Sequence, residues 1–382
     1  MLYLFMECDN MVYLDYSATT PVNDEVLDTF TKVSKNFIGN PNSLHKLGIE
    51  AKELIDASTK QIAGILNVKE KEIIYTSGAS EANNTAIMGV INKYPNRGKH
   101  IITTRLEHSS VIAPISYLQN NGYEIDFVEL DENGLVTVEN LKKVLRNDTV
   151  LVSICAVNSE LGIIQPIDEI GEFLKDYPTT IFHSDITQAI GKIKVNLENI
   201  DLASLSAQKF YGLKGVGCLI KKESISIEPL IHGGKSTTNY RSGTPAVALI
   251  ASLAKAFRLV FEDFDNKYNY VKELNEYLVS KLSEIDGVHI NSNSYSSPYI
   301  VNISIENIKS EVMLHALELE DIYISTQTAC SSGNVSMGVL EVTKNKDYAE
   351  HSLRVSLSYL TTKEEIDKFI EVFSIKMKEL NF

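Results

Sequence analysis

A lysine that follows an apolar segment is the first residue in this sequence that could do chemistry. The apolar run 200–205 ends in small and polar residues around Lys209, and three glycines follow within eight positions. Glycines let other groups approach the backbone closely. A lysine whose amine loses its proton through burial, or beside other cations, can attack a carbonyl group. Most lysines are solvated surface residues, so this interpretation of Lys209 depends on the rest of the chain.

A cysteine and an arginine near the C-terminus could also take part. Cys330 lies among small polar residues in 326–334, where no apolar periodicity is present. This pattern predicts an accessible thiol on a loop that can carry it toward a substrate. Cys155 and Cys218 lie within apolar runs and are expected to be buried. Arg354 could bind a carboxylate through two parallel hydrogen bonds.

Three further candidates each come directly after an apolar run. The stretch 76–81 places hydroxyls and small residues at a helix start, which suits a phosphate, although a plain capping box has the same pattern. Asp185, followed by Gln188, could pair with the protonated ring nitrogen of a cofactor, or simply cap a helix. His108 could stack on a planar cofactor and move protons, although a lone histidine is more often structural.

Short apolar runs alternate with helical spacing through the first two thirds of the chain, which predicts an α/β fold with a mostly parallel, seven-stranded sheet covered by helices. The predicted strands are 73–76, 100–104, 124–129, 150–156, 180–185, 202–205 and 216–220. Ligands of such sheets bind at the carboxyl ends of the strands, where these candidates are expected to gather.

The flanking segments predict a second, smaller α+β domain. We expect a long helix over 43–66 with Ser43 as its cap, and a helical region that Pro245 opens and that continues to about residue 282. Strands near 288–291 and 299–304, a helix over 310–319 and a last helix after Thr362 follow. The predicted domains are 21–260 for the large one and 1–20 plus 261–382 for the small one, which carries the loop with Cys330.

Composition favours small-molecule chemistry. The 382 residues are 44% hydrophobic and 23% charged, with a formal charge of −14, which argues against direct binding to nucleic acid or to an anionic membrane surface. No apolar run approaches the length of a membrane span, and the first residues do not resemble a signal peptide. The four cysteines form no CxxC pair, so we expect a reducing, cytoplasmic setting.

Taken together, the motifs resemble those of the cysteine desulfurases, in the long-loop, NifS/IscS-like branch of the class V aminotransferase family. The likeness covers nearly the whole chain from Val12 onward. The matching stretches are 13–20, 39–41, 76–81, 107–108, 165–167, 183–185 with Gln188, 209–212, 241–244, 329–332 and 352–354. The resemblance implies fold type I of the pyridoxal 5′-phosphate (PLP) enzymes and conversion of L-cysteine to L-alanine, with the sulfur left on Cys330 as a persulfide.

The resemblance also implies a role for individual residues. Lys209 would hold the cofactor covalently, Asp185 would bind its ring nitrogen and His108 would stack on its ring. Asn40 and Arg354 would hold the substrate carboxylate. The cofactor-binding positions would be Ala79, Ser80, His108, Asn158, Ser159, Asp185, Gln188 (on the phenolic oxygen), Ser206, Gln208, Lys209 and Thr244, the last reaching in from the partner of a homodimer. No resident metal is implied, although Cys330 could be a transient ligand of an iron–sulfur cluster.

The implied partner is a sulfur acceptor, either an iron–sulfur scaffold or a tRNA thiolation enzyme. Four positions depart from the family pattern: Gln208 replaces a histidine, Ser159 an asparagine, and Lys235 and Gln327 replace glycines. These changes leave two alternatives open. One is a selenocysteine lyase or another class V lyase, and the other is a weakly catalytic scaffold for sulfur transfer.

Overall fold

The computed structural model describes residues 11–234, 236–326 and 335–380. The chain forms two compact units. The larger unit comprises 20–158 and 164–264, and the smaller one comprises 159–163 and 265–382 together with the N-terminal residues up to Thr19. The predicted domain boundaries lie at 20/21 and 260/261, whereas the units divide at 19/20 and 264/265. A larger difference concerns the segment 159–163, which lies within the predicted large domain but belongs to the smaller unit.

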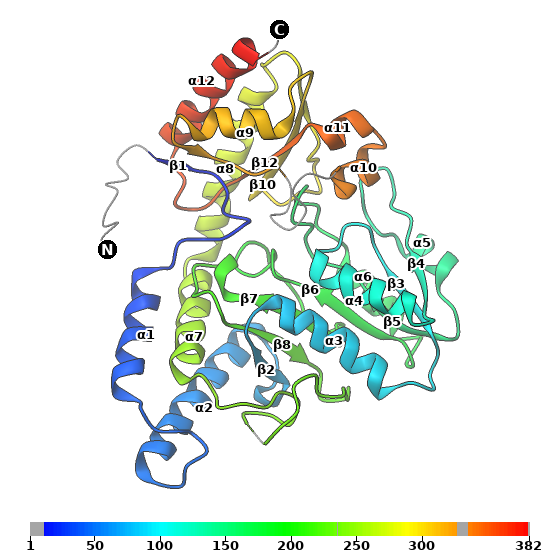
Figure 1. Cartoon of the computed structure of the whole chain (residues 1–382), viewed down its shortest axis with the longest axis vertical. Coiled ribbons are helices and arrows are strands. Elements are labelled where there is room, and N and C mark those ends of the chain that lie inside the picture. The colour runs from blue at the N-terminus through cyan, green and yellow to red at the C-terminus, as the bar shows by residue number, and fades with distance from the viewer. Residues whose placement is uncertain (1–10, 235, 327–334, 381–382) are drawn as a thin grey trace. The chain divides into compact units, whose positions relative to one another are not determined.

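The larger unit is built on a seven-stranded sheet with the order β2-β8-β7-β6-β5-β3-β4 (Figure 1). All neighbours are parallel except β8, which runs antiparallel to both β2 and β7. The predicted α/β fold is therefore confirmed. The strands are β2 (Ile73–Thr76), β3 (His100–Thr103), β4 (Glu124–Phe127), β5 (Thr149–Ser153), β6 (Ile181–Asp185), β7 (Leu202–Ser206) and β8 (Gly217–Lys221).

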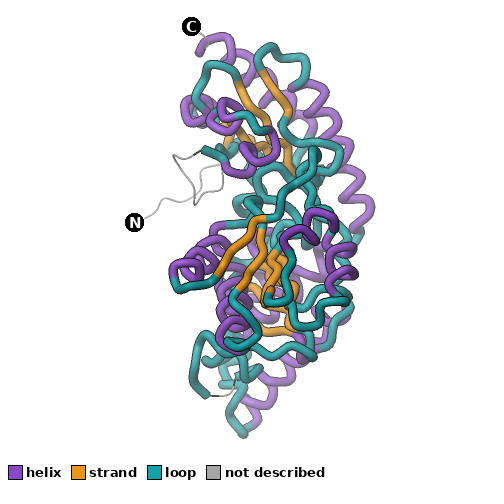
Figure 2. Tube along the Cα trace, turned by 90° about the vertical axis from the view of Figure 1, so that its right-hand side faces the viewer, coloured by secondary structure: helices purple, strands orange, loops and turns teal. Residues whose placement is uncertain are grey.

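Helices lie on both sides of this sheet (Figures 1 and 2). They are α1 (Asp24–Asn36), α2 (Lys46–Leu66), α3 (Ala79–Lys93), α4 (Ser109–Asn120), α5 (Val138–Val144), α6 (Ile167–Leu174) and α7 (Val247–Phe261), with the short 3-10 helices η1 (Glu70–Glu72) and η2 (Ala207–Lys209). The apolar faces of α3 and α4 pack with Ile74, Ile101 and Leu151 of the strands. Burial of such faces is the main favourable term in folding, and here it holds both helices on one face of the sheet.

One prediction about helices is wrong in detail, and another needs a subdivision. The long helix begins at Lys46, not near Ser43, and its cap is His45, whose Nδ1 accepts the Gly48 N–H at 3.3 Å. The predicted helical region after Pro245 is present and consists of two helices, because Asp263 adopts a left-handed conformation with φ of 57° between α7 and the next helix. Apolar periodicity did not reveal this break, since aspartate tolerates that conformation without a glycine signal.

The smaller unit has an antiparallel sheet with the order β12-β10-β9 and a short parallel pair, β1 with β11. Its strands are β1 (Val12–Tyr13), β9 (Val288–Ile290), β10 (Ile300–Ile305), β11 (Ile322–Tyr323) and β12 (Ser352–Ser356). Its helices are α8 (Phe264–Leu282, in this unit from Asp265 on), α9 (Ser310–Glu318), α10 (Met337–Thr343), α11 (Lys346–Glu350) and α12 (Lys363–Leu380). Among the residues that the structure describes, no helix is both long and apolar enough to span a bilayer.

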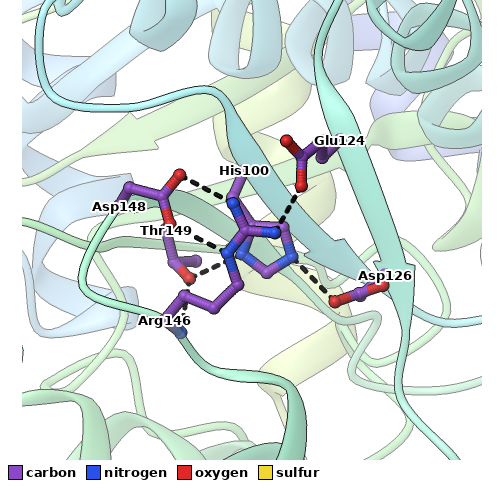
Figure 3. Close-up of polar contacts among 6 residues, drawn as sticks. All are labelled: His100, Glu124, Asp126, Arg146, Asp148 and Thr149. Carbon is purple, nitrogen blue, oxygen red and sulfur yellow. Dashed lines mark hydrogen bonds and ion pairs between the residues drawn. The ribbon is translucent and has the colours of Figure 1, made fainter.

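A polar network joins the amino ends of β3, β4 and β5 (Figure 3). The Thr149 hydroxyl accepts the Arg146 N–H at 2.9 Å, and its oxygen lies 2.8 Å from His100 Nδ1. His100 Nε2 then donates to Asp126 at 3.0 Å. This connectivity resembles a nucleophile–histidine–acid triad, but Thr149 and His100 are buried. The network is therefore a structural clamp at the edge opposite the candidate site.

Candidate active site

The carboxyl edge of the sheet in the larger unit gathers most of the predicted site residues. Gly217 pairs with both Thr76 and Ser206, and Asp185 pairs with Ser204 on the neighbouring strand. The start of α3, the end of β7 and the end of β6 therefore lie side by side. This is the edge at which parallel sheets bind their ligands.

Asp185 ends β6 with its carboxylate oriented by two hydrogen bonds. Its Oδ1 accepts the Thr187 N–H at 3.0 Å, and its Oδ2 accepts from Asn83 Nδ2 at 2.7 Å. Burial lowers the pKa of His183, two residues earlier, so that imidazole is neutral near pH 7. A buried carboxylate is costly without a cation, and His183 does not supply one. The site thus suits a cationic ring nitrogen.

His108 is the cap residue of α4. Its Nδ1 accepts the Ser110 N–H at 3.1 Å and lies 2.8 Å from the Ser110 hydroxyl oxygen. The ring is half-buried, with its position set by the first turn of the helix. An imidazole held in this way can present one face to a planar ligand.

Gln188 follows Asp185 on the same loop and is oriented by a lysine. Lys192 Nζ donates to Gln188 Oε1 at 2.5 Å, and both side chains are buried. Because an ammonium group can only donate, it selects the oxygen end of the amide. The amide nitrogen of Gln188 is therefore directed elsewhere, as binding to a phenolic oxygen requires.

The first turn of α3 has the features of an anion site. Its cap is Gly78, which makes no side-chain capping bond. Glu81 Oε2 accepts the Ser77 N–H at 2.7 Å, so only the glutamate half of the alternative capping box is present. Gly78 has φ of 151°, and a Cβ added there would lie 3.3 Å from Ser206 Oγ. A Cβ on Gly217 would lie 2.8 Å from the Gly78 Cα. The backbone N–H groups of this turn and the Ser206 hydroxyl thus form a cradle that side chains would fill.

Lys209 ends η2, directly after β7, and is half-buried. The residues around it are anchored on both sides by Thr20. The Thr20 N–H donates to the Gln208 carbonyl at 2.9 Å, and the Thr20 hydroxyl accepts the Tyr211 N–H at 2.7 Å. This short turn places Lys209 at the carboxyl edge of the sheet.

Glu107 is a buried carboxyl group in the turn that leads to His108. Its Oε1 accepts the Thr104 hydroxyl at 2.9 Å and the Cys155 N–H at 2.8 Å, whereas its Oε2 has no partner among the described residues. Burial raises the pKa of Glu107 to about 8. The group is therefore neutral near pH 7 and ties the His108 turn to the end of β5.

We expect Glu107 to make stability fall as the pH rises from about 4.5 to 8. In this window the folded protein keeps a proton that the unfolded chain has lost, so the unfolded state is favoured increasingly with pH. At 1.36 kcal/mol per pKa unit the loss is up to about 4 kcal/mol between pH 5 and 8. Urea unfolding at pH 5 and at pH 8 should show this loss of unfolding free energy in the wild type and not in Glu107→Gln. Equal slopes in the two proteins would contradict this role.

Arg354 lies on β12 in the smaller unit and is only 2% exposed. It donates to Asp15 Oδ1 and to the Ser159 carbonyl oxygen, at 2.8 and 2.9 Å. Two backbone hydrogen bonds form a bridge between Arg354 and Ser325, one donated by each N–H group. Ser159, predicted to bind the cofactor, thus contributes its carbonyl to Arg354. Cys330, like the departures Lys235 and Gln327, lies outside the described residues.

Several predicted cofactor or substrate residues lie at the surface or have other partners. Ser80 and Thr244 are exposed, and Thr244 lines a cleft of about 90 Å³ in the larger unit. Asn40 is exposed and its Oδ1 accepts the Asn42 N–H at 3.0 Å. Asn158 is buried and donates to the Leu106 carbonyl. Gln208 is half-buried, and its carbonyl is bound by Thr20.

Sequence reasoning missed four polar residues that orient the predicted ones: Asp15, Asn83, Ser110 and Lys192. Asn83 is fully buried on α3, beside Ala82 and Ala86. An asparagine on the apolar face of a helix is a signal that could have been noticed, since a buried amide requires partners. Asp15 and Lys192 give no such signal, because charged residues on loops are usually solvated.

The comparisons with known proteins agree with this geometry. The family model described as Aminotransferase class-V matches residues 12–369. The chain therefore belongs to the class V aminotransferase family. It is 42% identical over 374 residues to a NifS/IcsS protein homolog of Lactobacillus delbrueckii, covering 95% of this chain and 96% of that one. It is 38% identical to the cysteine desulfurase IscS of Dictyoglomus turgidum, covering 97% and 95%.

Solved structures show the same likeness. A NifS-like protein aligns with a TM-score of 0.92 and 34% identity, covering 97% of this chain and 100% of that one. A protein described as SspA in complex with cysteine aligns with a TM-score of 0.81 and 28% identity, covering 92% and 99%. The family and fold that the sequence motifs implied are thereby confirmed.

Proposed function

We propose that the protein is a PLP-dependent cysteine desulfurase that converts L-cysteine to L-alanine and leaves the sulfur on Cys330 as a persulfide. The observation that carries this proposal is the edge of the larger unit's sheet, where a buried, oriented carboxylate, a glycine-lined helix start and a lysine lie on neighbouring segments. Relatives with the same fold are named as cysteine desulfurases.

The residues present fit pyridoxal phosphate. The cradle of Gly78, Ala79 and Ser206 would hold the phosphate, with Ser80, Gln208 and Thr244 as further ligands. Asp185 has both oxygens placed as hydrogen-bond acceptors, which suits the ring nitrogen. Gln188 would donate to the phenolic oxygen, with Asn158 and Ser159 as further cofactor-binding residues. When bound, the cofactor supplies a sink for the electrons that are released as bonds at the substrate α-carbon break.

The side chains of this chain perform the remaining work. Lys209 would hold the cofactor and, once released, move the proton of the substrate α-carbon. Arg354 and Asn40 would bind the substrate carboxylate, and Asp15 and Ser159 hold two of the Arg354 N–H groups in place. The Cys330 thiolate would attack the substrate sulfur. The sulfur–carbon bond then breaks, the carbon side takes up a proton, and alanine leaves while Cys330 keeps the sulfur atom.

The position of Cys330 in the chain supports its role as acceptor. Cys330 comes five positions after Ser325, whose backbone is hydrogen-bonded to that of Arg354. Five positions of extended chain span about 17 Å, which supports a Cys330 thiol that can reach toward that bridge. The thiol can therefore come near the residue proposed to bind the substrate carboxylate.

We further propose a homodimer in the cytoplasm that passes sulfur to an acceptor protein, either an iron–sulfur scaffold or a tRNA thiolation enzyme. A depression of about 410 Å³ in the larger unit brings Asn40 and Thr244 together with Phe30, Phe37 and Ile38, and Ile38 is 75% exposed. An apolar surface beside two predicted site residues suits a second copy of the chain. Cys155 and Cys218 are free thiols, which fits a reducing setting.

The test is turnover by the purified, PLP-loaded protein with L-cysteine and with selenocysteine. We expect alanine and an equal amount of transferable sulfur from L-cysteine. A rate on selenocysteine at least about tenfold higher, independent of Cys330, would instead support the lyase alternative. No turnover on either substrate would support the scaffold alternative.

A further inference from the structure

A chain of three hydrogen bonds links Asp185 to His108 through two residues that no motif assigns. Asn83 Nδ2 lies 2.7 Å from Asp185 Oδ2 and 2.8 Å from Ser110 Oγ. Ser110 Oγ lies 2.8 Å from His108 Nδ1. The four residues come from β6, α3 and the start of α4, all within the larger unit.

The direction of each bond follows from the donors available. Asn83 must face Asp185 with its nitrogen, since its oxygen there would place two acceptors 2.7 Å apart. Both of its N–H groups are then used, one on Asp185 and one on the Ser110 hydroxyl oxygen. The single proton of the Ser110 hydroxyl remains for His108 Nδ1.

His108 Nδ1 is thereby an acceptor of two hydrogen bonds, from the hydroxyl and from the backbone N–H of Ser110. A neutral imidazole that accepts at Nδ1 carries its proton on Nε2. Protonation at Nδ1 would require both donors to move away. The ring is thus held in one tautomer as well as in one orientation.

Asn83 gives up a hydrogen bond to keep this arrangement. It is fully buried, and its Oδ1 has no hydrogen-bond partner among the described residues. A buried acceptor without a partner is destabilising. An apolar residue would avoid that cost on a helix face that also carries Ala82 and Ala86, so the amide has a purpose other than packing.

We propose that Asn83 and Ser110 are positioning residues that tie His108 to Asp185 and hold its imidazole neutral, with the proton on Nε2. This rests on the proposed function, in which Asp185 binds the cofactor ring nitrogen and His108 stacks on the same ring. This hydrogen-bonded relay of Asp185, Asn83, Ser110 and His108 couples the two contacts. The carboxylate that binds the ring nitrogen and the imidazole that stacks on the ring are thereby positioned together.

The most direct test is the ¹⁵N spectrum of histidine-labelled holoenzyme, with His108 assigned from the signal missing in His108→Gln. We expect the Nε2–H tautomer at pH 8 in the wild type. Ser110→Ala removes the hydroxyl and should give a mixture of tautomers, whereas Ser110→Thr should restore the wild-type signal. An Nδ1–H signal in the wild type, or an unchanged tautomer in Ser110→Ala, would overturn the proposal. The result does not depend on turnover, so it is separate from failure of the proposed function.

Kinetics and absorbance give a second readout. Ser110→Ala and Asn83→Ala should lower kcat about tenfold, with KM changed less than about twofold, because positioning acts on the reacting complex. Asn83→Ala should also shift the absorbance of the bound cofactor, since Asp185 loses one of its two partners. Ser109→Ala is the matched control, because Ser109 is exposed and lies outside the relay. A loss confined to KM, or equal effects in Ser109→Ala, would count against the relay.

Discussion

Lys209→Ala is expected to abolish alanine formation from L-cysteine, with a loss of about 10³-fold or more. The reason is positional, because Lys209 follows β7 at the carboxyl edge of the sheet, where Thr20 anchors the backbone on both sides of it. The variant should also fail to retain the cofactor covalently after treatment with borohydride. Fluorescence of the reduced cofactor on the denatured protein measures this directly.

Lys214→Ala is the matched control for that experiment. Lys214 lies five residues further along the same loop and is exposed, so its loss removes an equal charge without touching the site. It should turn over at the wild-type rate and keep the reduced cofactor. Covalent retention by Lys209→Ala would show that another lysine holds the cofactor, and the assignment would be wrong.

Cys330→Ala is expected to lower sulfur release from L-cysteine at least about 100-fold while leaving cofactor binding unchanged. Burial raises the pKa of both Cys155 and Cys218, so their thiols stay protonated and are poor nucleophiles. Among the cysteines that the structure describes, neither can therefore replace Cys330. Alanine assays and the absorbance of the bound cofactor measure the two effects separately.

Ser331→Ala controls for disturbance of the surrounding loop and should keep nearly full turnover. If Cys330→Ala still formed alanine at the wild-type rate, sulfur would be leaving without this acceptor. That outcome would favour the alternative of a selenocysteine lyase or another class V lyase.

The sheet and the edge that carries the site could be predicted from the sequence. Each predicted strand is present within a few residues, and Lys209, Asp185 and His108 all follow strands that end at one edge. The hydrophobic pattern and the composition were sufficient to predict the strands and this edge. Buried parallel strands are continuous apolar runs, and their carboxyl ends share an edge.

The contacts that orient the site could not be predicted. Asn83 lies 102 residues before Asp185, and Asp15 lies 339 before Arg354. Such pairs depend on tertiary packing, which local patterns do not encode. Ser159 is a related case, since its place in the sequence beside Asn158 suggested a cofactor ligand, whereas its carbonyl binds Arg354. The left-handed residue Asp263, which divides the helical region predicted after Pro245 into two helices, could not be predicted from periodicity either.

The central claim is that sulfur from L-cysteine moves to Cys330 as alanine is released. The most direct measurement is the mass of the peptide containing Cys330, after the PLP-loaded protein has met L-cysteine in the absence of reductant and has then been alkylated and digested. We expect this peptide to gain one sulfur atom, removable by a thiol reductant, with one alanine formed per modified chain. Alanine formation with the added sulfur on Cys155 or Cys218, or on no cysteine, would contradict the account.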